Sequence, residues 1–313
     1  MDAVTEFEGE RDRLLAVAYR MLGSRPEAED AVQEAWLRYQ AADRAAIEEL
    51  PAWLTTVTAR ICLDVLRSAR TRREAYVGPW LPEPLVSRLP GPGGLAGFAG
   101  DPADRAARTD EVSFALLVVM ERLTPEQRVA FVLHDVFAVP FEEIAQILGT
   151  TGAAARQLAS RARRAVTAEG APQHRADRAE QRRVLAAFVV AVEAGDLNGL
   201  LAVLAPDAVM IGDGGGVVSA ARHPVVGAAR VARFVAGIFR KAVKEATTIL
   251  VEPVLINGDL GLLTEATHPD GRAMRFTMAF AVADGRITGI FDQLNPAKLT
   301  AVPTPAPERA LPR

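Results

Sequence analysis

Apolar side chains recur at helical spacing in the first part of the chain. Between residues 6 and 40 they return with the period of an amphipathic helix, apart from a break at GSRPEAED. In that break Ser24 can cap a new helix, whose first turn carries Pro26 and acidic side chains that suit the positive end of the helix dipole. A further helical run starts at Pro51 and continues to residue 74. Residues 1–75 are therefore predicted to be an all-α domain.

The same helical period returns after residue 108. We expect helices over 109–123 and 125–137, followed by a short helix over 141–148 that ends at Gly149. Thr151 can cap a second helix, which runs to about residue 166. Two short helices joined by a tight turn that contains Gly form a helix-turn-helix. Residues 109–168 are therefore predicted to be a second all-α domain.

The pattern changes beyond residue 177. A helix over 177–194 and another near 227–241 are accompanied by long β-rich stretches, which are interrupted by Asn257-Gly258, Asp270-Gly271 and Asp284-Gly285. Such dipeptides between alternating apolar runs indicate hairpins. Helices followed by a curled antiparallel sheet predict an α+β domain over residues 177–299. The proline-rich residues 300–313 are predicted to be a disordered tail.

Residues 76–85 read YVGPWLPEPL and cannot form a helix, because each proline fixes its own φ and disfavours helix at the residue before it. The Gly- and Pro-rich residues 89–103 follow, so we predict a long linker over residues 76–108. The Tyr and Trp among the prolines suggest a strip that another surface binds. The alternative is an ordinary linker that tucks its Trp against its own domain.

Composition limits the class of protein. The chain has 313 residues, of which 50% are hydrophobic, enough for two or three domains with cores of their own. Its single cysteine, Cys62, excludes an internal disulfide and a multi-cysteine zinc site. No signal peptide or membrane-spanning stretch is visible, so we expect a cytoplasmic protein that does not contact a membrane.

Charge is segregated along the chain although the net charge is only −3. Residues 1–50 contain 6 Arg against 12 acidic side chains, whereas residues 51–75 contain 5 Arg against 2 and residues 150–185 contain 8 Arg against 3. Two arginine-rich segments on helices suggest that the partner is an extended polyanion.

The second helix of the helix-turn-helix carries no acidic side chain between residues 151 and 166. Arg and Gln suit base edges and phosphates in a major groove, which makes this helix a candidate DNA reader. The alternative is a solvated basic helix without specificity. The candidate side chains are Arg156, Gln157, Ser160, Arg161, Arg163 and Arg164.

Three stretches together resemble a known family. LLAVAYRMLGSRPEAEDAVQEAWLRYQ, LPAWLTTVTARICLDVLRSARTRRE and LTPEQRVAFVLHDVFAVPFEEIAQILGTTGAAARQLASRARRAV resemble domains two and four of bacterial extracytoplasmic-function (ECF) sigma factors, over about residues 6–75 and 109–167. The resemblance implies a domain-two bundle, a domain-four helix-turn-helix, and core RNA polymerase and promoter DNA as partners.

The resemblance also assigns residues to roles. It implies that Asp30, Gln33, Glu34 and Trp36 bind polymerase, that Trp53, Arg60, Arg67 and Arg70 bind the minus-ten element, and that the second helix of the helix-turn-helix reads the minus-thirty-five element. Trp36 and Trp53 could instead be core residues. Ile61 stands where relatives often have Asn, and Leu158-Ala159 stands where many have Arg-Leu.

Residues 177–299 resemble a SnoaL-like fold, the cone of the nuclear transport factor and ketosteroid isomerase superfamily. Enzymes of that superfamily use carboxylates and histidines in a pocket. The candidates here have no diagnostic spacing and could be surface or turn residues, so we predict no catalytic residues, no cofactor and no metal. These candidates are Asp207, Asp213, His223, Glu265, His268 and Asp292.

The whole chain resembles the ECF sigma factors with a fused SnoaL-like domain, a group that shares YVGPWLPEPL, a DGGG loop and an NPxKL motif. Val217 stands here where Lys follows the glycines in typical members. The resemblance implies a regulator in cis that contacts domain two or the linker and replaces a separate anti-sigma factor. The residues assigned to regulation are Tyr76, Trp80, Leu81, Asp213, Gly214, Asn295 and Lys298.

Two other functions fit parts of the sequence. The SnoaL-like domain could transform a small organic molecule while the DNA-binding half controls its own locus. Alternatively, the chain could be a ligand-responsive repressor with a helix-turn-helix but no contact with polymerase.

Overall fold

The computed structural model describes residues 2–74, 76–89, 112–168 and 176–307, with residues 70–74 as backbone only. The chain divides into two compact units. Unit 1 comprises residues 1–75 and 119–169, and unit 2 comprises residues 76–118 and 170–313. The predicted linker therefore begins inside unit 2, and its residues 90–108, which include most of the stretch expected to be flexible, lie outside the described residues.

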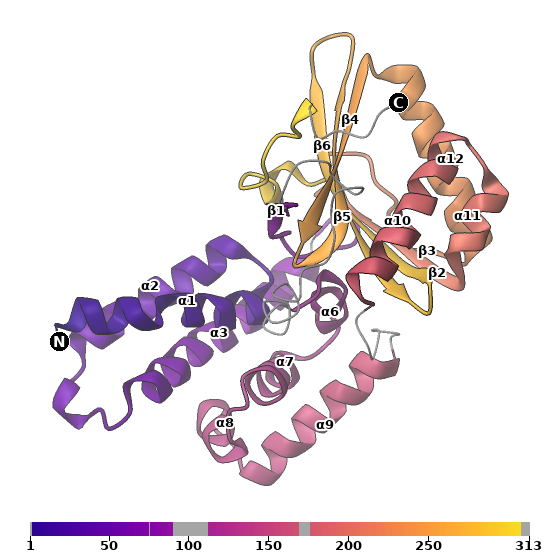
Figure 1. Cartoon of the computed structure of the whole chain (residues 1–313). Coiled ribbons are helices and arrows are strands. Elements are labelled where there is room, and N and C mark those ends of the chain that lie inside the picture. The colour runs from indigo at the N-terminus through magenta and orange to yellow at the C-terminus, as the bar shows by residue number, and fades with distance from the viewer. Residues whose placement is uncertain (1, 75, 90–111, 169–175, 308–313) are drawn as a thin grey trace. The chain divides into compact units, whose positions relative to one another are not determined.

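Unit 1 consists of helices (Figure 1). The predicted cap at Ser24 is confirmed, because its side chain accepts a hydrogen bond from the backbone N–H of Glu27. The bounds are α1 (Ala3–Leu22), α2 (Arg25–Ala41), a 3-10 turn (Arg44–Ala46), α3 (Leu50–Glu74), α7 (Pro125–Phe131), a π-helical turn (Val132–Val136), α8 (Phe141–Leu148) and α9 (Gly152–Ala168).

The predicted helix-turn-helix is confirmed as α8 and α9. Gly149 ends α8 with a left-handed φ of 62°, and the hydroxyl of Thr151 accepts a hydrogen bond from Ala154 N–H at 3.2 Å. Small buried side chains on one face of α9 allow this helix to pack against α7 and α8. The opposite face, which carries the predicted DNA contacts, stays exposed.

Unit 2 is built on an open sheet, in which the described residues form seven strands in the order β1-β4-β5-β6-β7-β2-β3. It is mostly antiparallel, as predicted, but β2 lies between β3 and the last strand, β7, and it is antiparallel to β3 and parallel to β7. The strands are β1 (Val86–Arg88), β2 (Leu204–Asp213), β3 (Val225–Val226), β4 (Thr248–Ile256), β5 (Asp259–Thr267), β6 (Ala273–Ala283) and β7 (Arg286–Gln293).

Local sequence signals account for the hairpins of this sheet. Asn257-Gly258 joins β4 to β5 and Asp284-Gly285 joins β6 to β7, and all four of these residues have positive φ, as a two-residue hairpin turn requires. β1 comes from the predicted linker and pairs with β4. A strand of three residues beside prolines has no alternating pattern by which the sequence could predict it.

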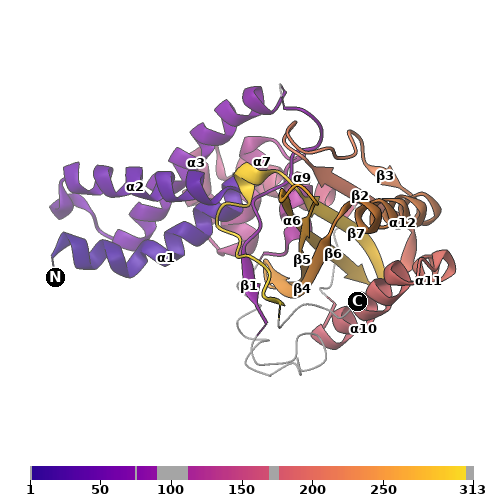
Figure 2. The same cartoon turned by 90° about the horizontal axis from the view of Figure 1, so that it is seen from above.

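Both faces of the sheet are covered. Residues alternate along each strand, so that Ile290 points into a core beneath α10, α11 and α12 while Phe291 points into a second core on the other face. Figures 1 and 2 show the three helices together on one side of the strands. Their bounds are α10 (Arg178–Glu193), α11 (Leu197–Val203) and α12 (Ala228–Glu245).

The second core is completed by chain from outside the predicted α+β domain. Leu81 of the linker, Phe114 of α6 (Phe114–Met120) and Val302 of the C-terminal segment are all buried in it. The helix predicted over 109–123 is therefore shorter among the described residues, and its first residues pack with unit 2. None of the helices that the structure describes has the length and apolar character that a membrane span needs.

The C-terminal segment differs from its predicted disorder as far as it is described, to Pro307. Arg275 donates to the carbonyl oxygen of Val302 at 3.0 Å, and Arg88 donates to that of Thr304 at 2.8 Å. The carboxylate of Glu252 accepts from Ala306 N–H at 2.8 Å. These partners come from β6, β1 and β4, so only the tertiary structure could reveal that the segment is held.

Asp292 of β7 is buried, and its Oδ1 has no hydrogen-bond partner among the described residues. Burial raises the pKa of this carboxyl to about 7. The folded pKa thus lies above the value of about 3.9 expected in the unfolded chain. The Asp292 contribution to stability is therefore lost as pH rises from about 4 to above 7, because the folded state must then bury a charge.

Asp292→Asn should stabilise the chain at pH 8 by on the order of 2–4 kcal/mol and much less at pH 5, because Asn cannot ionise. Denaturant unfolding at the two pH values measures the difference. Asp207→Asn, at an exposed position of β2, is the matched control and should show no such dependence. An equal shift at both pH values would contradict this interpretation of Asp292.

Candidate functional site

The start of the linker is held by the ends of β2 and β7 within unit 2. We call this set of contacts the clasp. It consists of Tyr76, Trp80 and Leu81 from the linker together with Asp213, Gln293, Asn295 and Lys298.

Asp213, the last residue of β2, is the centre of the clasp and is fully buried. A buried carboxylate is stable only when donors surround it. Two of its donors come from the linker, and the others from the loop after β2 and from the C-terminal end of the fold. They are Tyr76 Oη at 2.6 Å, Leu81 N–H at 2.9 Å, Gly215 N–H at 3.0 Å, Gln293 Nε2 at 3.4 Å and Lys298 Nζ at 2.7 Å.

Lys298 connects the carboxylate to the linker backbone and to its aromatic rings. Its Nζ donates to the carbonyl oxygen of Leu81 at 2.6 Å and lies 3.9 Å from the centroid of the Trp80 ring. The side chain is only 10% exposed. A desolvated cation over a tryptophan face is worth up to about 2 kcal/mol. The Lys298 ammonium therefore holds the Trp80 ring directly, and the hydrogen bonds of Leu81 hold the backbone beside it.

Asn295 orders the NPAKL turn and closes the clasp around Tyr76. Its Oδ1 accepts from Ala297 N–H at 3.0 Å, which caps the 3-10 turn Pro296–Lys298, and its Nδ2 donates to Tyr76 Oη at 2.8 Å. Burial, together with the hydrogen bond to Asp213, raises the pKa of Tyr76. The phenol therefore stays protonated and donates.

The DGGG loop needs its glycines for close approach. A Cβ on Gly214 would collide with the carbonyl oxygen of Val218, and a Cβ on Gly215, where φ is +62°, would collide with the side chain of Asn295. The loop can therefore bring Gly215 N–H to Asp213 only with glycine at these positions.

Gln293 belongs to the clasp but was not predicted from the sequence. It is fully buried, and its Nε2 donates to the carbonyl oxygens of Leu81 at 3.2 Å and Pro82 at 3.0 Å. An amide side chain at the end of a strand, two residues before NPAKL, is the signal that could have indicated it. All seven residues assigned to regulation lie in or directly beside the clasp.

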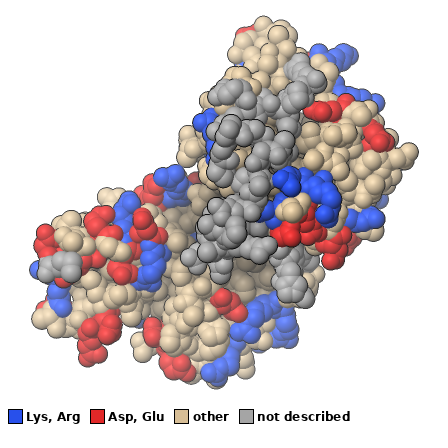
Figure 3. Space-filling model, in the orientation of Figure 1, with Lys and Arg blue, Asp and Glu red and all other residues tan. Residues whose placement is uncertain are grey.

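The candidate DNA-reading face of α9 is exposed and basic. Figure 3 shows Lys and Arg side chains following this helix along the lower edge of the view. Gln157, Arg161 and Arg164 are exposed and Ser160 is half-buried. Arg163 pairs with Asp135 at 2.6 Å and Arg156 lies over the ring of Phe141, contacts that the sequence did not indicate.

The candidate minus-ten residues on α3 are partly engaged within unit 1. Arg60 Nη2 donates to the carbonyl oxygen of Gln146 at 3.0 Å, and Arg67 pairs with Glu126 at 3.0 Å. The side chain of Arg70 lies outside the described residues. The first contact places a backbone atom of α8 beside Arg60, and the second places a side chain of α7 beside Arg67.

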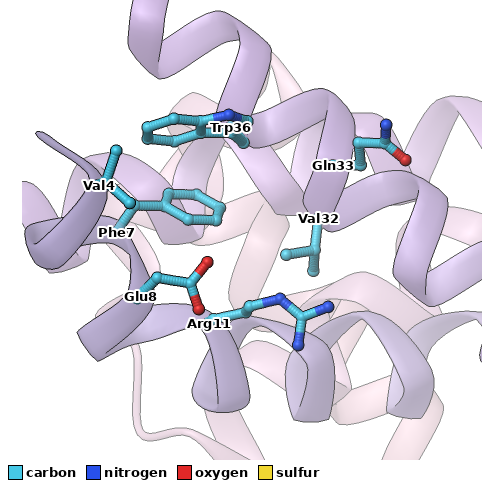
Figure 4. Close-up of a pocket in the computed structure, with 7 residues that line it drawn as sticks. All are labelled: Val4, Phe7, Glu8, Arg11, Val32, Gln33 and Trp36. Atoms are coloured by element: carbon cyan, nitrogen blue, oxygen red, sulfur yellow. The ribbon is translucent and has the colours of Figure 1, made fainter.

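Both tryptophans on the candidate polymerase and minus-ten faces are half-buried in one aromatic cluster with Phe7 and Tyr39. Asp30 and Gln33 on α2 are exposed and Glu34 is half-buried. Trp36 and Gln33 also line a surface pocket of about 270 Å³ between α1 and α2. Figure 4 shows Trp36 and Phe7 at one end of this pocket and Glu8 and Arg11 at the other.

The candidate catalytic residues of unit 2 have separate surroundings. Asp213 is in the clasp, Asp292 is buried in the sheet, and Glu265 pairs with Arg275 at 2.9 Å. Asp207 and His223 are exposed. His268 is at the tip of the hairpin between β5 and β6, where its backbone bonds to Arg272. Among the described residues no group of three or more His, Cys, Asp or Glu side chains could hold a metal.

Comparison with known proteins agrees with this arrangement. Family models match for Sigma-70 region 2 over residues 7–72, Sigma-70 region 4 over residues 113–166 and the SnoaL-like domain over residues 185–290. The chain is 45% identical to ECF RNA polymerase sigma factor SigJ of Mycobacterium tuberculosis (strain ATCC 25618 / H37Rv) over 307 residues, 96% of this chain and 94% of that protein.

Two further similarities extend over most of the chain. It is 37% identical to the probable ECF RNA polymerase sigma factor SigI of Mycobacterium tuberculosis (strain CDC 1551 / Oshkosh) over 289 residues, 92% of each chain. The crystal structure of Mycobacterium tuberculosis extracytoplasmic function sigma factor SigJ aligns with a TM-score of 0.75 at 42% identity, and covers 96% of this chain and 99% of that chain.

Lys298→Met should loosen the clasp, because it leaves the Asp213 carboxylate buried without its cation, a change that costs about 3–5 kcal/mol for a fully buried pair. Amide hydrogen exchange at Leu81 should accelerate. The double variant Asp213→Asn with Lys298→Met should recover part of the loss. Lys244→Met, at an exposed lysine, is the control. Unchanged exchange at Leu81 would show that Lys298 does not hold the linker.

Proposed function

Because this chain belongs to the ECF RNA polymerase sigma factors and carries a C-terminal SnoaL-like domain, we infer that it directs promoter recognition and transcription initiation, and we propose that the C-terminal domain regulates this activity in cis. The clasp is the observation that carries the proposal. No separate anti-sigma factor is then required.

Regulation follows from where the held segment lies in the chain. Tyr76 comes two residues after α3 ends at Glu74. The clasp therefore binds the segment that follows, in the chain, the helix assigned to the minus-ten element. Leu81 is held through its N–H, its carbonyl oxygen and its buried side chain. Holding this segment limits the paths by which the chain can connect α3 to the helix-turn-helix.

The DNA contacts follow from the exposed basic faces. We propose that Arg156, Gln157, Ser160, Arg161, Arg163 and Arg164 read the minus-thirty-five element, and that Trp53, Arg60, Arg67 and Arg70 meet the minus-ten element. Phosphate contacts from Arg would position these helices, while contacts from Gln and Arg to base edges would supply specificity. Strand separation would be offset by the capture of unstacked bases.

We propose that core RNA polymerase binds α2 through Asp30, Gln33, Glu34 and Trp36. Exposed acidic and polar side chains beside a half-buried tryptophan suit a basic partner surface with an apolar anchor. Co-purification of the full-length chain with core polymerase tests this step, and it separates a sigma factor from a repressor that binds DNA alone.

Trp80→Ala should change transcription without unfolding either unit. Loss of the contact between the Trp80 ring and the Lys298 ammonium removes up to about 2 kcal/mol from the held state of the linker, so its equilibrium should shift by up to roughly thirtyfold. In vitro transcription with core polymerase on the DNA upstream of its own gene measures the effect. Trp80→Ala and Lys298→Met should change activity in the same direction.

The control for this experiment is Leu85→Ala, an exposed position in the same segment, which should behave as wild type. Wild-type transcription by both Trp80→Ala and Lys298→Met, with the Leu81 amide shown to be released, would exclude cis regulation through the clasp. Failure of the wild-type chain to initiate at all would instead count against the sigma-factor function.

Glu126→Gln should strengthen promoter binding. Arg67 must give up its ion pair with Glu126 before it can meet a phosphate, and an ion pair at this degree of exposure is worth at most about 1 kcal/mol. The affinity of the holoenzyme for promoter DNA should therefore rise by no more than about fivefold. Asp64→Asn, whose carboxylate is a distant 3.9 Å from Arg67, should have less effect. Weaker binding by Glu126→Gln would contradict a role for Arg67 at phosphates.

A further inference from the structure

A third basic segment lies in the SnoaL-like domain, where the proposed function assigns no DNA contact. Residues 214–251 contain 6 Lys and Arg against 1 acidic side chain, Glu245. Five of the six basic residues are on α12, and all five are exposed. They are Arg230, Arg233, Arg240, Lys241 and Lys244.

These side chains share one face of α12. At 3.6 residues per turn their positions fall within an arc of about 100°, opposite the buried Val231 and Val235. The stripe from Arg230 to Lys244 is about 21 Å long. We call it the α12 stripe. α12 packs on α11 and β2 through its buried face, which leaves the stripe on the outside of unit 2.

The described residues around the α12 stripe do little to neutralise its charge. Among the described residues its one ion pair is the exposed contact of Lys241 with Glu245, at 3.9 Å. The adjacent helix α11 has the sequence LNGLLAV and carries no charge. A row of like charges on one helix destabilises that helix modestly, and an anion along the row would relieve the repulsion.

Gly237 lies at the middle of the stripe, and apart from the adjoining residues and backbone of its own helix no atom of the described residues is within 4 Å of where its Cβ would be. Glycine inside a helix costs up to about 1 kcal/mol relative to Ala. Because glycine has no side chain, the surface is lower here, between the pair Arg230 and Arg233 and the group that starts at Arg240. A long ligand could approach the helix backbone at this position. The first group ends at Arg233 and the second begins at Arg240, so the gap between them is about 10 Å along the axis, comparable to the width of a DNA groove.

The chain connections make duplex DNA the fitting occupant. Residues 169–177 separate the end of α9 from the start of α10, and a chain of that length spans at most about 30 Å. Unit 2 also begins immediately after α3. The domain that carries the stripe is therefore tethered to both helices assigned to promoter DNA, so the effective concentration of DNA at the stripe is high once either helix is bound.

We propose that the α12 stripe is a third DNA-contacting surface, which binds the phosphate backbone of double-stranded DNA beside the promoter elements without reading its sequence. The proposal rests on the sigma-factor function proposed above. The stripe contains Arg and Lys but no Asn or Gln that could pair with a base edge. Its side chains would neutralise phosphates and release counterions, so the contact would raise the affinity for DNA of any sequence equally and make that affinity more dependent on salt.

The first test removes charge. The triple variant Arg230→Gln, Arg233→Gln and Lys244→Gln should reduce the slope of log affinity against log salt by about 2–3 if each side chain meets one phosphate. Binding is measured with the full-length chain, alone and with core polymerase, on promoter and random-sequence duplexes. The affinity for both duplexes should fall by the same factor. Arg272→Gln, an exposed arginine at a hairpin tip, is the control and should leave the slope unchanged.

The second test adds charge at the centre of the stripe. Gly237→Lys should steepen the salt dependence by up to about 1 and tighten DNA binding relative to Gly237→Gln. Both substitutions remove the same glycine and find open space, so their difference reports charge and not helix stability. Equal affinity and slope for the two variants would overturn the proposal even if the triple variant proved unstable.

Other outcomes are equally decisive. If the triple variant keeps the wild-type slope while the wild-type chain initiates transcription, the stripe does not contact DNA and only this inference fails. If the wild-type chain initiates nothing, the sigma-factor function fails, and the slope measured on the chain alone still decides whether the stripe binds DNA. Loss of binding to phosphatidylglycerol vesicles with an unchanged DNA slope would assign the stripe to a lipid surface and overturn the proposal.

Discussion

The buried carboxylate of Asp213 is the constraint on which the linker side of unit 2 depends. A charge removed from water is tolerated only if nearly all its acceptor positions are filled, and here two of the donors, Tyr76 Oη and Leu81 N–H, come from the linker. Releasing the linker would remove two of the five donors to Asp213, and it would take the Leu81 carbonyl oxygen and the Trp80 ring from Lys298. The pair therefore contributes specificity of linker binding more than net stability, since the cost of desolvating both ions offsets much of their attraction.

The same linker helps to cover the sheet. An open sheet with apolar residues on both faces must be covered on both, and α10, α11 and α12 cover only one. Leu81, Phe114 and Val302 come from three separate segments and bury the other face. This explains why residues 76–118 belong to unit 2 although they stand before the helix-turn-helix in the chain. The linker is therefore bound to unit 2 both by polar contacts in the clasp and by apolar contacts in this second core.

Charge is distributed unevenly among the helices. α2 carries four acidic side chains against two arginines, whereas arginines and lysines outnumber acidic side chains on α3, α9 and α12. In unit 1 some of these arginines already have internal partners, as Arg67 has in Glu126 and Arg163 in Asp135. When unit 1 binds a polyanion, each of these arginines must exchange its internal carboxylate for a phosphate. The affinity of unit 1 for the polyanion is therefore lower than its number of arginines suggests. On α12, Arg230 and Arg233 have no ion pair with any residue that the structure describes, so no such exchange with those residues is needed.

Features that depend on neighbouring residues in the chain were predictable from the sequence, whereas features that depend on packing between distant segments were not. The sequence by itself determined the helices, the cap at Ser24, the turn at Gly149 and the hairpins at Asn257 and Asp284, because each depends on residues a few positions apart. Through family resemblance it also indicated the residues of the clasp other than Gln293. Only the tertiary structure decided the parallel pairing of β2 with β7, strand β1, the packed C-terminal segment and the internal partners of the arginines. Each of these joins residues far apart in the chain, where neither periodicity nor turn chemistry carries information about the partner.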